Sequence, residues 1–195
     1  KAVDVIEDIV DRFPSRLEPL MELVDLYDRL KDYKKVIHTL DRLEKIDGKS
    51  EQISMEKFRI YLQTKDLERA FAEIENLVQE YPYEMRYLNI LGDVYLENGR
   101  IEEAYSIFKK VLKDEPGYAP AMLSLVSYYE KTGQDSLYRS QLDSVLLNRN
   151  VESGMKVNIM RQLIARSERG DKDSTKIVGL FDDILEQDQP NADVA

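Results

Sequence analysis

Tyrosine recurs at an interval of 34 residues along this chain, and that interval constrains the fold more than any other feature. Prolines and small or apolar residues follow the same interval, with Gly48 filling one missing proline position. A period of this length is the mark of stacked repeats. The residues on the period are Tyr27, Tyr61, Tyr95 and Tyr129; Pro14, Pro82 and Pro116; Ala2, Val36, Ala70 and Ala104; and Ile6, Leu40, Ile74, Phe108 and Leu142.

Each repeat is expected to be a pair of helices. Long segments rich in Leu, Glu, Lys, Arg and Ala are interrupted about every 15 residues, which favours helices. The chain has only 8 Gly and 6 Pro, too few for a protein of many short strands. Asp32 and Asp66 stand where helix N-caps belong. The predicted helices are 2–13, 17–30, 33–47, 51–64, 67–80, 85–98, 101–114, 119–132, 135–148, 153–167 and 175–187.

The third complete repeat carries a recognisable motif. Leu88-x₂-Leu91-Gly92-x₂-Tyr95, then Ala104-x₃-Phe108, then Pro116, resembles the tetratricopeptide repeat, with Leu88 where that pattern usually has Trp. Other repeats depart from it: Lys57-Phe58 replaces Leu-Gly, and Tyr138 occupies a small-residue position, where we expect altered helix packing. The resemblance implies an all-α fold, a right-handed α-α superhelix built as a solenoid of antiparallel helix pairs. Gly92 and Ala104 are expected to let paired helices approach closely.

The period also predicts the domain organisation, a single solenoid over 1–195. It divides into a half unit 1–16, units 17–50, 51–84, 85–118 and 119–152, a divergent unit 153–190, and the start of another at 191–195. Because the last proline is six residues late, we place a polar loop at 166–175. We interpret the chain as a segment of a longer solenoid. We therefore expect an uncovered apolar stripe on the first helix (Val3, Ile6, Ile9 and Val10) and on the helix around 177–185, with end-to-end contact between copies.

Charge and composition limit the classes of partner that this chain is suited to bind. Net charge is −10 and acids alternate with bases, so no basic stripe suits nucleic acid or an anionic membrane surface. No apolar run approaches the length of a bilayer-spanning helix, so we expect no membrane insertion. The chain has no Cys, which excludes disulfides and thiolate metal sites. These features leave the compartment open.

No catalytic, cofactor or metal site is expected. Gly48-Lys49-Ser50 lacks the earlier Gly of a phosphate-binding loop, and Asp171-Lys172-Asp173-Ser174 lacks the Gly and Glu of a calcium loop. His38 is the only histidine, so a zinc site or a Cys–His pair cannot form. Paired carboxylates such as Glu102 and Glu103 diverge around a helix. The sequence therefore predicts a protein that is not an enzyme.

A protein or peptide partner is expected on the inward face of each first helix, as the family resemblance implies. Five of twelve matching residues are apolar, four are acidic and one is basic; Arg86, one turn away, adds a second cation. This mixture suits an amphipathic helix or an extended peptide. The clamp that some family members use for acidic chaperone tails, Lys then Asn four residues apart, is absent. The alternative is a structural spacer or self-associating segment. The candidate residues are Met21, Asp25, Asp28, Met55, Arg59, Leu62, Arg86, Asn89, Asp93, Leu96, Leu123, Ser127 and Glu130.

Overall fold

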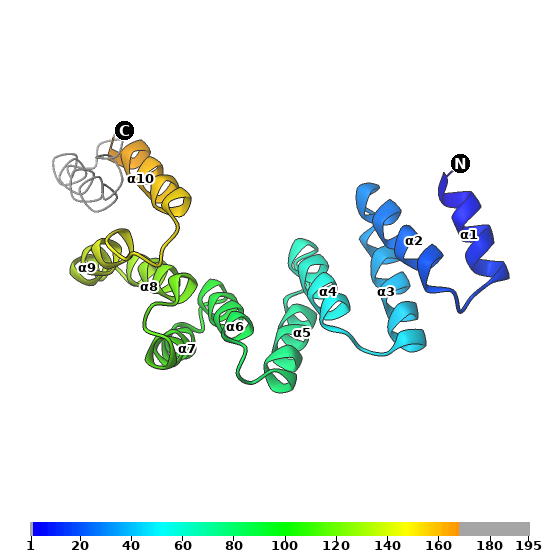
Figure 1. Ribbon diagram of the computed structural model, residues 1–195, viewed down its shortest axis with the longest axis horizontal. Helices are drawn as coiled ribbons and strands as arrows, with labels where there is room; N and C mark the ends of the chain where they lie inside the picture. Colours follow the sequence, from blue (N-terminus) through cyan, green and yellow to red (C-terminus); the bar gives the residue numbers. More distant parts are fainter. Residues whose placement is uncertain (1, 168–195) are drawn as a thin grey trace, which may run out of the picture. The chain divides into compact units, whose positions relative to one another are not determined.

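The structure, a computed structural model, describes residues 2–167, and these are folded as helices joined by short turns, with no strand among them (Figure 1). The all-α prediction is confirmed. In chain order the helices are α1 (Ala2–Arg12), α2 (Leu17–Arg29), α3 (Tyr33–Asp47), α4 (Glu51–Gln63), α5 (Leu67–Glu80), α6 (Met85–Glu97), α7 (Ile101–Asp114), α8 (Ala119–Lys131), α9 (Asp135–Leu146) and α10 (Ser153–Ser167).

The predicted helix boundaries agree with these to within two residues. The N-caps are the reason in two cases. The Asp32 carboxylate accepts the backbone N–H of Lys35 and the Asp66 carboxylate accepts that of Arg69, which satisfies a donor that the first helical turn leaves free. The predicted helix 175–187 and the predicted loop beyond Ser167 lie outside the described residues.

The C-terminal ends of the first helices repeat one backbone arrangement. The carbonyls of the periodic tyrosines in α2, α4, α6 and α8 each accept an N–H from five residues further on, at 2.8–2.9 Å. The residue before each of these donors has a left-handed backbone: Lys31, Lys65, Gly99 and Gly133, with φ of 58°, 60°, 78° and 68°. This is the bonding pattern that commonly ends a helix. The backbone conformation at the helix ends therefore follows the same 34-residue period as the side chains.

The described residues pack as two compact units, which meet between Tyr87 and Leu88 in the sequence. In the first unit, α2 packs on α3 and α4 packs on α5 as helix hairpins, and α1 packs on α2. Leu20, Val36 and Ile60 are completely buried in its core.

The prediction of an uncovered apolar stripe on the first helix is wrong. Val10 is 1% exposed, and Val3 and Ile6 pack against the core of the first unit. The turn after Arg12 folds α1 back onto α2, where the Tyr27 hydroxyl bonds to the Glu7 carboxylate. The chain itself therefore covers the apolar stripe that we expected to be exposed and to contact another copy.

The second unit has the packing that the motif predicts. Ala104 and Phe108 are completely buried, and Leu91 and Tyr95 are less than a tenth exposed. A Cβ added at Gly92 would lie 2.5 Å from Phe108 Cε1, so only glycine allows this approach of α6 and α7. Tyr138, which corresponds to Ala104 one repeat later, is only half-buried and packs beside Leu142 and Leu146.

The first unit buries a charged side chain, Lys57, at the position where the repeat motif usually has Leu. The Lys57 side chain is 6% exposed, and its Nζ lies 2.7 Å from Asp41 Oδ1 and also pairs with Glu44. Both acids belong to α3, so a buried cation ties α4 to the preceding second helix. Buried charges require partners of this kind.

Candidate functional site

Two helices of the first unit carry six of the thirteen predicted partner-binding residues. We call Met21, Asp25 and Asp28 of α2, with Met55, Arg59 and Leu62 of α4, the α2/α4 face. Met21 is 61% exposed and Leu62 is 38% exposed. Met21, Asp25 and Asp28 are spaced to lie along one side of α2. The face thus presents apolar side chains next to charged ones.

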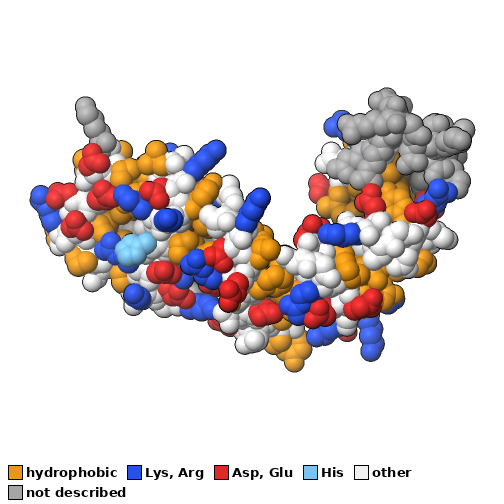
Figure 2. Space-filling view, turned by 180° about the vertical axis from the view of Figure 1, so that it is seen from behind, with side chains coloured by type: hydrophobic (Ala, Val, Ile, Leu, Met, Phe, Trp, Pro, Cys, Tyr) orange, Lys and Arg blue, Asp and Glu red, His pale blue; other side chains and the backbone are white. Residues whose placement is uncertain are grey.

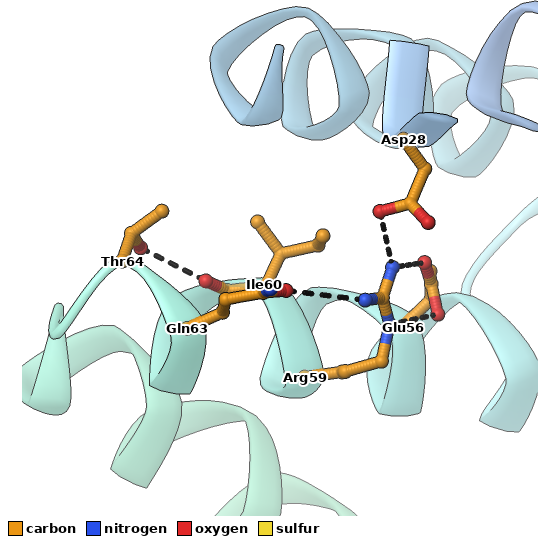
Figure 3. Close-up of polar contacts among 6 residues, drawn as sticks. All are labelled: Asp28, Glu56, Arg59, Ile60, Gln63 and Thr64. Carbon is orange, nitrogen blue, oxygen red and sulfur yellow. Dashed lines mark hydrogen bonds and ion pairs between the residues drawn. The ribbon is translucent and has the colours of Figure 1, made fainter. Parts of the chain in front are cut away.

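Arg59 holds the two helices of this face together. Its Nη2 atom lies 2.7 Å from Asp28 Oδ1 and 2.5 Å from Glu56 Oε1, and its Nη1 donates to Gln63 Oε1 at 3.3 Å (Figure 3). Its Nε donates to the second oxygen of Glu56 at 3.0 Å. Glu56 and Asp28 together raise the pKa of Arg59 above its usual range. Every nitrogen of the guanidinium is therefore in use.

A shallow hollow lies over α4 beside this network. Met55, Phe58 and Leu62 form its apolar part. The sequence did not single out Glu56 or Gln63, although their spacing from Arg59, three residues before and four after, is the one at which helical side chains meet. The lining residues are Gln52, Met55, Glu56, Phe58, Arg59, Leu62 and Gln63.

Arg86, the second predicted cation, is also engaged. Its Nη2 atom lies 2.5 Å from Glu51 Oε1 and 2.8 Å from the Tyr87 hydroxyl. The bond to Glu51 raises the pKa of Arg86. Neither arginine among the candidate residues is thus an open anion-binding group.

The second unit carries the other predicted residues. We call Asn89, Asp93 and Leu96 of α6, with Leu123, Ser127 and Glu130 of α8, the α6/α8 face. Asn89 is 4% exposed, and its Nδ2 donates to Asp93 Oδ2 at 3.0 Å and to Ser124 Oγ at 3.1 Å. The Ser124 bond joins α8 to α6. The Asn89 carbonyl oxygen is buried and has no hydrogen-bond partner among the described residues.

Asp93 is the most perturbed acid of this face. Burial raises its pKa to about 6, and the nearby Glu97 carboxylate adds to the rise, while the Ser124 hydroxyl opposes it. Burial disfavours the charged form of a carboxyl group, so an ionised Asp93 lies in an unfavourable setting unless a cation joins it. Perturbed groups of this kind cluster at functional sites.

The remaining residues of the α6/α8 face differ in accessibility. Leu96 is 2% exposed and belongs to the core, so it is not part of a surface that a partner could contact. Leu123 is half-buried, whereas Ser127 and Glu130 are exposed. The sequence pattern placed these residues one helical turn apart but did not distinguish a core leucine from a surface one.

The described residues bear on whether the chain could bind a metal ion or use a histidine in catalysis. Among them, no group of three His, Asp or Glu side chains is placed to hold a metal ion. His38 is exposed, and on the face shown in Figure 2 it lies among Lys, Arg, Asp and Glu side chains of mixed sign. None of the described helices is both long enough and apolar enough to cross a membrane.

Comparison with known proteins supports the repeat assignment. The family model described as tetratricopeptide repeat matches residues 86–116. No curated protein matches the chain. That match covers one repeat of the chain, and the fold described above is that of a tetratricopeptide-repeat solenoid.

Solved structures share the fold at low sequence identity. A tetratricopeptide repeat protein from Parabacteroides merdae is 12% identical, with a TM-score of 0.68 over 97% of this chain and 73% of that one. MamA from Desulfovibrio magneticus is 17% identical, with a TM-score of 0.62 over 78% and 86% of the two chains. YrrB, described as having an unusual peptide-binding site, is 13% identical, with a TM-score of 0.60 over 82% of each chain.

Proposed function

We propose that this protein is a non-catalytic scaffold that binds a segment of a partner protein on the faces of its first helices. The observation that carries the proposal is the α2/α4 face, where Met21 and Leu62 are exposed on neighbouring helices beside an ordered polar network. Exposed apolar side chains between fixed polar groups are the usual composition of a peptide-binding surface.

The Arg59 network links the two helices of this face. Arg59 joins α4 to Asp28 of α2, so the two helices do not have to be ordered when a partner arrives. Preorganisation of this kind lowers the entropy that association costs. The peptide-binding site described for YrrB, which shares the fold, is consistent with such a role.

The test is an unbiased peptide-display selection against the whole chain, followed by fluorescence anisotropy with the selected peptides. Leu62→Gln should weaken binding by about tenfold, the effect of losing one apolar anchor. Leu67→Gln is the matched control, because Leu67 is 40% exposed but lies at the start of α5, a second helix. Failure to select any peptide, or equal effects of the two variants, would contradict the proposal.

A further inference from the structure

The carboxylates of the α2/α4 face outnumber its available cations. Arg59 is surrounded by Asp28, Glu56 and Gln63, and hydrogen bonds to these residues use four of the five N–H groups of its guanidinium. An acidic partner would have to displace these bonds. Arg86, engaged with Glu51, offers no alternative.

Asp25 is the acid of this face that remains open. It is exposed, and no described residue forms an ion pair with it. It follows the exposed Met21 by four residues, so the two side chains lie one above the other on α2. This spacing places an apolar contact and an uncompensated carboxylate within reach of one partner segment.

The α6/α8 face shows the same excess of acceptors independently. Asp93 is partly buried and no ion pair joins it to a described residue, although Glu97 nearby adds a second negative charge. The buried Asn89 carbonyl oxygen beside it has no donor. A buried acceptor without a donor costs free energy. Asp93 accepts a hydrogen bond from Asn89 but has no counter-charge among the described residues, so its ionised form favours a cationic neighbour. An ammonium or guanidinium group is such a neighbour.

We infer that the partner segment is cationic, with a Lys or Arg side chain next to an apolar one, and that Asp25 and Met21 on α2 are its principal contacts. This inference rests on the proposed function. The ammonium or guanidinium pairs with the Asp25 carboxylate while the apolar side chain packs on Met21. The net charge of −10 also favours the approach of a cationic segment.

The experiment uses the peptides from the display selection described above. The selected sequences should carry net positive charge. Each is then synthesised in two further forms, with its Lys and Arg residues changed to Gln or to Glu, and its affinity for the whole chain is measured by anisotropy. The parent peptide should bind at least about tenfold more tightly than the Glu form, and the difference should shrink in high salt because exposed charges are screened.

A matched pair of variants separates local recognition from the general effect of net charge. Asp25→Asn should weaken binding of the parent peptide by about fivefold. Asp47→Asn removes the same charge from α3 of the same unit, where Asp47 is exposed, and should change binding by less than about twofold.

The outcomes distinguish the inference from the proposed function. Selection of no peptide contradicts the proposed function itself. Selected peptides that are neutral or acidic, or equal losses in Asp25→Asn and Asp47→Asn, overturn the cationic inference while leaving peptide binding in place. Basic peptides that depend on Asp25 support both.

Discussion

The second and third complete repeats fill the same two positions with opposite chemistry. Lys57 and Phe58 of α4 correspond, 34 residues earlier, to Leu91 and Gly92 of α6. All four residues are buried. One repeat places a cation there and neutralises it with Asp41 and Glu44, whereas the other places a leucine.

The comparison extends to the partner helices. Gly92 leaves room for the completely buried Phe108, and at the corresponding positions the second repeat has the larger Phe58 and the smaller Ile74. The large and small residues have exchanged places. At these positions the 34-residue period preserves burial, while the size and charge of the buried side chains differ between the two repeats.

The largest expected effect comes from removing the partners of the buried cation. Asp41→Asn combined with Glu44→Gln should lower the free energy of unfolding by about 3 kcal/mol, because the buried Lys57 would lose both of its ion-pair partners and keep only the more distant Glu73 carboxylate. Lys57→Met, which removes the cation instead, should change stability by less than about 1 kcal/mol. Urea denaturation of the two variants compares the costs. A cost for Lys57→Met as large as that of the double variant would show that the charge itself stabilises the repeat.

The glycine of the third repeat gives the next effect. Gly92→Ala should destabilise the protein by about 1–3 kcal/mol, because the added Cβ would clash with the ring of Phe108. Phe108 is completely buried, so its ring cannot move out into solvent to relieve the clash. Adding Phe108→Ile should restore part of the loss by reproducing the smaller residue of the second repeat. Thermal unfolding midpoints test this pair. A double variant less stable than Gly92→Ala would refute the exchange of sizes.

Asp93 should give a smaller effect that depends on pH. Its pKa in the folded protein, about 6, is above that of an unfolded chain, so the folded state binds the proton more tightly. The stability contributed by this group is present below about pH 4 and is lost as the pH rises through about 6. Asp93→Asn should therefore stabilise the protein by about 1–2 kcal/mol at pH 8 and have little effect at pH 4.

The control for this prediction is Asp143→Asn in α9, where the residue is exposed. It should show no comparable dependence on pH. Urea midpoints of both variants between pH 4 and pH 8 provide the measurement, and parallel curves for Asp93→Asn and the unchanged protein would contradict the burial of its charge.

The smallest expected effect concerns the ends of the first helices. Lys65 has a left-handed backbone, with φ of 60°, at the position that Gly99 occupies in the next repeat. Lys65→Gly should relieve strain and raise stability by up to about 1 kcal/mol, reduced by the greater freedom of glycine in the unfolded chain. Gly99→Lys is the reverse change and should lower the thermal midpoint. Changes of the same sign in both variants would be inconsistent with a shared left-handed position.

The sequence predicted the fold well because the repeat specifies it locally. The period, the aspartate caps and the prolines each indicate where a helix begins or ends, and none of these signals requires knowledge of distant contacts. The first-helix stripe was predicted wrongly for the opposite reason. Val3 and Ile6 were correctly recognised as apolar, but which helix covers them depends on tertiary packing that the sequence pattern does not contain.

The candidate surface was predicted only in outline. The pattern chose the side of each first helix, but Leu96 is buried on that side and Arg59 is occupied by Asp28, 31 residues away. The sequence suggested a surface of mixed charge, and the ion pairs leave the carboxylates in excess. That these faces bind a partner stays a prediction.

The most direct test of partner binding on the first helices is photo-crosslinking. A peptide from the selection, carrying a photoreactive group, is irradiated with the whole chain, and the crosslinked residues are located by mass spectrometry. We expect crosslinks on α2 and α4, centred on Met21 and Leu62. Crosslinks centred on the second helices, around Ile46 and Leu67, which are about as exposed as Leu62, would contradict binding on the first helices.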